Sequence, residues 1–200
     1  MSTLDWNEVG PGIVLINNIG NGQKYIDMVE GHVKNKKLSW VSDRNKKIDE
    51  DVDKKAMQTM YIRNVRRHGL VDPLNPKPEE LLHEHIFDRF ERDFDLACKK
   101  YISDFQVPVS QKEDYEILKY NEGNFFINHI DDGLFMTRKV SLVYYFNDNY
   151  TGGEIIFPRT GVVIKPKANQ LALFPSNYMY NHNVSEVTSG TRYSMVNWLK

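Results

Sequence analysis

The pattern of apolar and polar residues changes character near residue 107 of the 200-residue chain. Beyond that point, short runs rich in β-branched and aromatic residues are separated by turn sequences such as NDNYTGG, PRTG, KPKAN and TSGT. Apolar runs of this length between turn residues are typical of β-strands. The predicted strands are YEILKY, NFFINHI, KVSLVYYF, GEIIF, GVVIK, QLALF and RYSMVNWL.

Before residue 107, apolar residues recur mainly at helical spacing. The segment 23–33 follows a short strand, IVLIN (13–17), and has Asn21 as a candidate N-cap. A longer helix is predicted over 75–105, with prolines at its start, acids in its first turn and Cys98 as a small core residue. Its inward-facing stripe comprises Leu82, Ile86, Phe90, Phe94, Ala97 and Tyr101.

Helices followed by closely spaced strands predict an α+β protein whose second half is a β-sandwich or barrel. The length suits one domain over 1–200, in which 1–106 is mainly helical support and 107–200 is the β core. Residues 43–55, DRNKKIDEDVDKK, carry five acids and five bases. A mixed-sign run of this kind predicts a solvated loop, and the segment is a candidate lid over a cleft.

Charge and composition exclude several classes of function. The 26 basic and 27 acidic residues give a net charge of −1, which offers no electrostatic footprint for nucleic acid or an anionic membrane. A single cysteine permits no internal disulfide. With no secretory pattern at the N-terminus and no apolar segment of about 18 residues, we expect a cytoplasmic protein without a membrane span.

Two motifs resemble functional sites, but their spacing does not fit a metal site or a nucleotide-binding site. His83 and His85 fall on the long helix, where residues two apart point in different directions and cannot hold one ion, so both are predicted at the surface. The GNG turn at 20–22 lacks the third glycine of a dinucleotide-binding turn, and no alternation of strands and helices follows it.

The predicted strand FFINHIDDGLF contains two candidate metal ligands. On a strand, residues two apart share a face, so His129 and Asp131 are expected to converge, with Asp132, Phe126 and Asn128 turned away. Of the other histidines, the β region contains His182. Two histidines and a carboxylate are the facial ligand set of non-haem Fe(II) oxygenases, although a zinc hydrolase with an added general base could use the same residues.

Arg192 on the last strand points to an anionic ligand. A cationic side chain within an apolar strand is costly without an anionic partner, and no acid in that strand supplies one. A guanidinium pairs naturally with a carboxylate, and Ser194 shares its face of the strand. These residues predict a buried site for the distal carboxylate of a small dicarboxylate.

Four features in order, YNEG, HID, YYFNDNYTGGEIIFP and a histidine ten residues before RYSMVNWL, resemble the Fe(II)- and 2-oxoglutarate-dependent dioxygenases. The resemblance is to the prolyl 4-hydroxylase-like branch over about 115–199, with a weaker N-terminal match in IVLINNIGNGQKYIDMV. It implies a double-stranded β-helix, the cupin-like jelly roll, supported by N-terminal helices. It also implies Fe(II), 2-oxoglutarate and O2, with ascorbate as a further candidate.

The same resemblance implies roles for individual residues. His129, Asp131 and His182 match the iron ligands, and Arg192 matches the residue that binds the 2-oxoglutarate C5 carboxylate. The other implied contacts are Tyr120, Tyr145 and Ser194 at the cosubstrate, and Arg138 and Trp198 near the substrate. The collagen-type enzymes commonly have lysine at the position of Arg192, where arginine resembles the oxygen-sensing and microbial relatives.

The implied reaction is hydroxylation of an unactivated C–H bond with release of succinate and CO2, most favoured on a prolyl residue of a peptide or protein. A lysyl side chain or a free amino acid is the alternative acceptor. Less favoured are nucleic-acid demethylation, because Trp198 replaces the second arginine of that branch, and a non-catalytic metal-binding jelly roll. The oligomeric state stays open.

Overall fold

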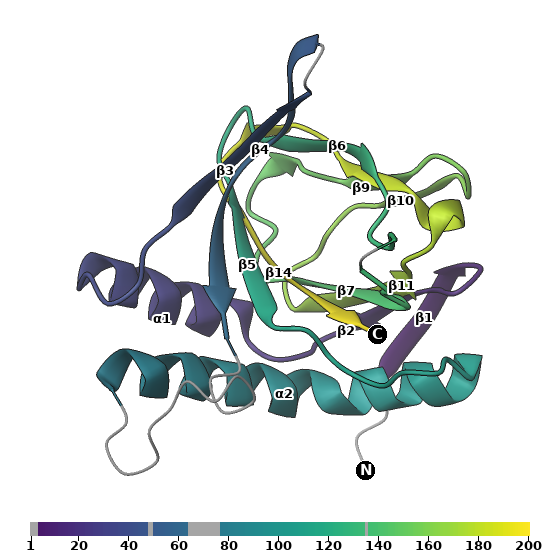
Figure 1. Cartoon of the computed structure of the whole chain (residues 1–200), viewed down its shortest axis with the longest axis horizontal. Helices are drawn as coiled ribbons and strands as arrows, with labels where there is room; N and C mark the ends of the chain where they lie inside the picture. The colour runs from purple at the N-terminus through teal and green to yellow at the C-terminus, as the bar shows by residue number, and fades with distance from the viewer. Residues whose placement is uncertain (1–3, 48–49, 64–76, 135) are drawn as a thin grey trace.

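The computed structural model of the chain describes residues 4–47, 50–63, 77–134 and 136–200. A twelve-stranded antiparallel sheet dominates it and curls around an interior space, while two helices lie together against its outer side (Figure 1). The strands follow the order β1-β2-β11-β7-β14-β5-β4-β6-β12-β9-β10, and β3 pairs with β4 off this path. A separate two-stranded sheet joins β8 and β13.

The bounds of the elements confirm most of the expected pattern. The strands of the first half are β1 (Asp5–Gly10), β2 (Ile13–Asn17), β3 (Val41–Lys47) and β4 (Glu50–Ile62). Those of the second half are β5 (Tyr115–Tyr120), β6 (Phe125–His129), β7 (Val140–Tyr145), β8 (Thr151–Gly152), β9 (Ile155–Phe157), β10 (Val162–Ile164), β11 (Gln170–Pro175), β12 (His182–Val184), β13 (Val187–Ser189) and β14 (Arg192–Leu199). The helices are α1 (Gly22–Lys34) and α2 (Pro78–Phe105), with a 3-10 turn η1 (Tyr178–Tyr180).

The helix ends follow from local chemistry. The Asn21 side chain accepts a hydrogen bond from the backbone N–H of Lys24, which confirms it as the N-cap of α1. At the start of α2, the Glu80 carboxylate accepts from the backbone N–H of Lys77. The helix ends at Gln106, whose left-handed backbone (φ 51°) turns the chain towards β5.

One expectation fails here. The segment 43–55 was expected to be a solvated loop, but its described residues belong to β3 and β4, which pair with each other as a hairpin. The end of β4 also pairs with β5, from Gln58 opposite Lys119 to Ile62 opposite Tyr115. Tertiary pairing therefore overrides a charge pattern that is typical of loops. Whether this hairpin acts as a lid stays a prediction.

The part before residue 107 supplies strands β1 to β4 as well as both helices, so it contributes to the sheet itself. The N-terminal strand β2 is hydrogen-bonded to β11, and β4 lies between β5 and β6. The two parts of the chain thus share one sheet. Their description as one domain with a β core at 107–200 stays a prediction.

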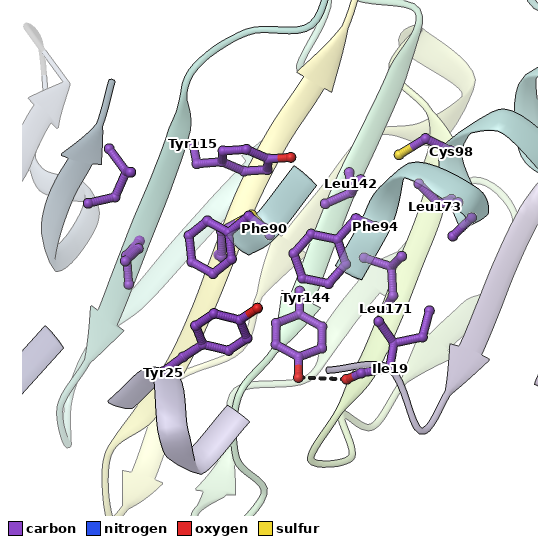
Figure 2. Close-up of a cluster of buried hydrophobic side chains, with 14 of the residues drawn as sticks. Ile19, Tyr25, Phe90, Phe94, Cys98, Tyr115, Leu142, Tyr144, Leu171 and Leu173 are labelled. Atoms are coloured by element: carbon purple, nitrogen blue, oxygen red, sulfur yellow. Dashed lines mark hydrogen bonds between the residues drawn. The ribbon is translucent and has the colours of Figure 1, made fainter. Parts of the chain in front are cut away.

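Two hydrophobic clusters lie on opposite faces of this sheet. The larger one fills the space between the sheet and the two helices, where Tyr25 of α1 meets Phe90 and Phe94 of α2 and Tyr144 of β7 (Figure 2). Cys98 is buried in this cluster, as expected. The smaller cluster lies inside the curl and contains Tyr145, the sequence neighbour of Tyr144. Because side chains alternate along a strand, alternate residues of β7 belong to the two clusters.

Candidate functional site

The three predicted metal ligands lie together at the inner face of the curled sheet. One ligand atom from each of His129, Asp131 and His182 lies within 4.8 Å of the others, and no other group of three metal-capable side chains is found in the described part of the chain. The Nε2 atom of His129 is 3.6 Å from Asp131 Oδ1, and Nε2 of His182 is 3.8 Å from Asp131 Oδ2. These gaps are too long for direct hydrogen bonds.

Strand pairing explains how residues so far apart in sequence meet. β12 pairs with β6 so that His182 lies directly opposite His129. Their ring centroids are 4.3 Å apart. Asp131 was expected on the strand with His129. It instead lies in a bend, two residues after the end of β6. The cross-strand pair and the bend together bring the carboxylate up to both imidazoles.

The tautomers of both histidines suit metal binding. Nδ1 of His129 lies 2.9 Å from the carbonyl oxygen of Ile127, and Nδ1 of His182 lies 3.0 Å from that of Tyr180. A carbonyl can only accept a hydrogen bond, so each Nδ1 carries the proton. Each Nε2 then presents a lone pair towards Asp131, which is how metal-bound histidines are usually oriented. The residues present therefore fit a divalent metal ion.

Asp131 is held as a carboxylate in a buried place. Burial alone would raise its pKa, but electrostatic interactions with His182 and His129 and hydrogen bonds from Ser141 and Trp198 outweigh it and hold the pKa below its usual value. The Ser141 hydroxyl donates to Asp131 Oδ2 at 2.6 Å. An ionised carboxylate between two lone pairs is a complete donor set for a cation.

Phe126 does not follow the alternation expected for β6, because it lies on the same face as His129. Its ring stacks on the His129 imidazole, with centroids 3.7 Å apart and planes at 13°, although it was expected on the opposite side. The register explains this, because His182 pairs with His129 while Val184 pairs with Phe126. One extra residue in β6 makes a bulge, and a bulge brings residues three apart to the same face.

Arg192 lies deep in the same region, with a relative exposure of 1%. Its Nη1 donates to the Ser194 hydroxyl at 2.7 Å, and its Nε donates to the Gly153 carbonyl at 3.1 Å. Its guanidinium carbon lies 4.9 Å from the ring centroid of Tyr120 and 5.4 Å from that of Tyr145. None of the ion pairs found in the described part of the chain involves this guanidinium.

Two phenol groups lie beside Arg192. The Tyr145 hydroxyl is buried and has no hydrogen-bond partner in the described part of the chain, although buried polar groups are normally satisfied. Burial raises the pKa of both phenols, and Arg192 lowers it in part, by its charge at Tyr145 and by its charge and a hydrogen bond at Tyr150. A buried cation beside an unpartnered hydroxyl is the complement of a carboxylate.

A single cavity of about 410 Å³ connects the metal-capable cluster with Arg192. Its wall includes His129, Asp131, His182, Arg192, Ser194, Tyr120, Val143, Arg138 and Trp198. Tyr145 contacts Arg192 from behind this wall. A mostly apolar cavity with a few convergent polar groups is the usual form of a small-molecule site.

Arg138 and Trp198 stand at this cavity but are already engaged with the protein. The Arg138 guanidinium donates two hydrogen bonds to the Glu113 carboxylate, at 2.9 and 2.8 Å. It also lies 3.6 Å from the Trp198 ring centroid. Their predicted contact with substrate stays a prediction. His83 and His85 lie on α2, outside the metal-capable cluster.

Sequence reasoning missed four residues of the site: Phe126, Ser141, Tyr150 and Gly153. The glycine pair at 152–153 was expected to form a tight turn, and both residues do have positive φ. Gly153 also accepts from Arg192, and a Cβ there would lie 2.8 Å from Arg192 Cδ. The glycine pair was the one available signal, because the other contacts depend on register and on distant strands.

Comparisons with known proteins agree with this geometry. Residues 115–200 match the sequence model of the 2OG-Fe(II) oxygenase superfamily. A PKHD-type hydroxylase of Parvibaculum lavamentivorans is 33% identical over 88 residues, which is 41% of this chain and 39% of that protein. The aligned part of the chain therefore spans about two fifths of the length of this curated relative.

Solved structures share the fold over nearly the whole chain. A prolyl hydroxylase from Trichoplax adhaerens, in complex with a hypoxia inducible factor peptide, has a TM-score of 0.62 and 19% identity, covering 94% of this chain and 83% of that chain. A Pseudomonas putida prolyl-4-hydroxylase has a TM-score of 0.60 and 17% identity, covering 94% and 92%. A viral collagen prolyl hydroxylase from Paramecium bursaria Chlorella virus-1 has a TM-score of 0.61 and 15% identity, covering 95% and 96%.

These structures confirm the α+β double-stranded β-helix expected from the sequence. The family that matches is named for Fe(II) and 2-oxoglutarate, the two components for which the cluster and Arg192 offer complementary groups. Residues 115–200 are thus similar to the 2OG-Fe(II) oxygenase superfamily, and the chain shares the fold of the prolyl hydroxylase structures.

Proposed function

We propose that this chain is an Fe(II)- and 2-oxoglutarate-dependent dioxygenase that hydroxylates a prolyl residue of a peptide. The observation that carries the proposal is the presence of His129, Asp131 and His182 in one cavity with a buried Arg192 that has no acidic partner among the described residues. The three metal-capable residues and the Arg192 guanidinium are independent observations, and both belong to the same cavity.

The three metal-capable residues would bind the iron. His129, Asp131 and His182 would hold Fe(II), since two imidazoles and a carboxylate on one side leave room for other ligands. When bound, Fe(II) with 2-oxoglutarate and O2 supplies an oxidation that forms succinate and CO2 and hydroxylates a C–H bond. The protein binds, orients and shields the reactants.

Arg192 would bind the far carboxylate of 2-oxoglutarate. Ser194 and Gly153 fix the plane of its guanidinium, and the rings of Tyr120 and Tyr145 pack beside it. The Tyr145 hydroxyl is free to donate to the same carboxylate. Burial strengthens each of these interactions, because little water competes for the charge.

The mouth of the cavity supports a peptide as the acceptor. Tyr61, Ile130 and Met136 contribute to its wall, and they remain 54%, 45% and 48% exposed. Large apolar side chains that stay exposed around a cavity often mark a binding surface. The choice of proline follows the names of the similar proteins, which are hydroxylases of prolyl residues. Ascorbate use and a cytoplasmic location stay predictions.

None of the helices described is long and apolar enough to cross a membrane. A peptide that reaches the exposed apolar side chains around the cavity is the acceptor to test first. The alternative acceptors of the same scaffold, a lysyl side chain or a free amino acid, can be included in the same assay.

The test is hydroxylation of a peptide library. Purified protein, Fe(II), 2-oxoglutarate and O2 would be incubated with proline-containing peptides, matched peptides with alanine in place of proline, and lysine-containing peptides. We expect one added oxygen on proline by mass spectrometry, with an equal amount of succinate. His129→Ala should give neither product. Oxygen addition to lysine instead would overturn the prolyl acceptor, and equal turnover by His129→Ala would overturn the iron site.

A further inference from the structure

A pair of buried serines stands behind the predicted iron ligand Asp131. Ser141 lies on β7 and Ser176 follows the end of β11, and both are 1% exposed. The Ser141 hydroxyl contacts Asp131 Oδ2 at 2.6 Å and the Ser176 hydroxyl at 2.8 Å. Neither serine faces solvent.

The direction of these hydrogen bonds follows from their chemistry. A hydroxyl has one hydrogen, and an ionised carboxylate can only accept. Because Ser141 donates to Asp131, Ser176 must donate to the Ser141 oxygen. The result is a chain from Ser176 through Ser141 to Asp131. A hydrogen bond that ends on a charged acceptor is short and strong, and the preceding bond reinforces it.

The Ser176 backbone fastens the segment that carries Asp131. Its carbonyl accepts from the N–H of Asp132 at 3.0 Å, and its N–H donates to the carbonyl of Lys139 at 3.0 Å. Ser176 therefore holds both ends of the loop between β6 and β7. The serine hydroxyls fix the Asp131 carboxylate while the Ser176 backbone fixes the chain that presents it.

This arrangement has a consequence for metal binding. Asp131 lies in a bend beyond the end of β6, so no strand ladder restrains its side chain. With Oδ2 tied to Ser141, the carboxylate cannot rotate freely away from the Nε2 atoms of His129 and His182, which lie 3.6 and 3.8 Å from its oxygens. Groups that orient a metal ligand in this way typically affect metal affinity about 10–100-fold.

We infer that Ser141, supported by Ser176, is a positioning residue that orients Asp131 for the metal. The inference rests on the proposed iron site but adds two residues that the ligand set does not contain. Ser141→Ala removes the donor to Asp131 Oδ2 and leaves the hydrogen bond from Trp198. Ser176→Ala removes only the second hydrogen bond, so its effect should be smaller. Ser141→Thr keeps a hydroxyl on the same carbon and should restore most of the affinity.

The experiment is calorimetric titration of Co(II), a stand-in for Fe(II), into the purified metal-free protein. We expect Ser141→Ala to weaken Co(II) binding about 10–100-fold. Ser176→Ala should weaken it less, and Ser141→Thr should lie close to wild type. Tyr144→Phe is the matched control, because it deletes a buried hydroxyl bonded to the Ile19 carbonyl on the other face of the sheet. It should lower thermal stability and leave Co(II) affinity unchanged.

Two results separate this inference from the proposed function. If Asp131→Ala abolishes Co(II) binding while Ser141→Ala and Ser176→Ala bind as wild type does, the positioning role is wrong and the metal site stands. If wild type does not bind Co(II), the metal site itself is wrong. Should Ser141→Ala fail to fold by circular dichroism, Ser176→Ala decides the matter: wild-type affinity in that variant overturns the serine chain.

Discussion

Tyr144 and Tyr145 are neighbours on β7 with no exposed surface, yet they belong to opposite faces of the sheet and differ in one respect. The Tyr144 hydroxyl donates to the Ile19 carbonyl at 2.7 Å, on the side covered by the helices (Figure 2). The Tyr145 hydroxyl, inside the curl beside Arg192, has no hydrogen-bond partner among the residues described. An unsatisfied buried group costs about 1–3 kcal/mol, so the inner face is incomplete without a ligand.

The same contrast holds for the charges. On the helix side, two buried phenols are paired with carboxylates: Tyr25 donates to Asp93, and Tyr115 donates to Glu91. On the inner side, Arg192 contacts a hydroxyl, a carbonyl and two rings but forms none of the ion pairs described. The helix-side groups named here thus have partners within the protein, whereas Arg192 and the Tyr145 hydroxyl are suited to a ligand. Mutations on the helix side should therefore affect mainly stability, and mutations on the inner side mainly ligand binding.

The largest expected loss of stability is on the helix side. Phe94 is fully buried and lies 4.8 Å from the Tyr144 ring and 5.9 Å from the Phe90 ring, between centroids. Phe94→Ala should lower the free energy of unfolding by about 3–5 kcal/mol, because it leaves a cavity in a packed core. Urea denaturation measures this loss. The folded fraction should bind 2-oxoglutarate with unchanged affinity, and a weakened affinity would show that the faces are coupled.

The matching change on the inner side acts on binding. Arg192→Met keeps much of the side-chain volume but removes the guanidinium, and should weaken 2-oxoglutarate binding by roughly 10²–10³-fold, since one partner of a desolvated ion pair is lost. The ligand-free protein loses the hydrogen bonds to Ser194 and Gly153 but also a buried charge that no described carboxylate pairs, so its loss of stability should be smaller than that of Phe94→Ala. Unchanged 2-oxoglutarate affinity would contradict the role of Arg192.

The tyrosine pair gives a smaller but sharper comparison. Tyr144→Phe should cost about 1 kcal/mol of stability, because the Ile19 carbonyl loses its donor. Tyr145→Phe should cost none, and should instead weaken 2-oxoglutarate binding about fivefold, the equivalent of about 1 kcal/mol. Thermal unfolding and calorimetry on the two variants test both halves. Equal losses of stability would remove the distinction between the faces.

The smallest expected effect is a pH dependence at the cavity edge. Burial would raise the pKa of Glu113, but hydrogen bonds and charges from Arg138 and Lys200 hold it below the usual value. Its contribution to stability is therefore complete above the ordinary glutamate pKa of about 4.3, and is lost as pH falls through the lower folded-state value. Glu113→Gln should be less stable than wild type at neutral pH. The two proteins should converge in acid, and a constant difference at all pH values would contradict the linkage.

Much of the fold could be predicted because local signals agree with tertiary structure. The helix over Pro78–Phe105 has proline at its start and apolar residues at helical spacing, and all but one of the expected inward residues are buried. The strands from Tyr115 onwards lie between turn residues. The candidate metal ligands could be predicted because His129 and Asp131 lie two residues apart in sequence and few histidines remained to join them.

The remaining features depend on pairing that a single sequence does not reveal. The charged hairpin of β3 and β4 is a strand pair because β4 adds to the edge of β5, which its composition does not indicate. Phe126 reaches His129 only through the bulge in β6. Ser141 and Ser176 meet Asp131 from distant points of the chain, so their role appears only when the strands are in place.

The most direct test of the account is a calorimetric titration of 2-oxoglutarate into Co(II)-loaded protein, repeated with His182→Ala and Arg192→Met. The metal-capable residues and the Arg192 guanidinium line one cavity. Binding should be tight in wild type, and each substitution should weaken it by at least about 100-fold. Equal binding of 2-oxoglutarate in all three proteins would contradict a site shared by the metal ligands and Arg192.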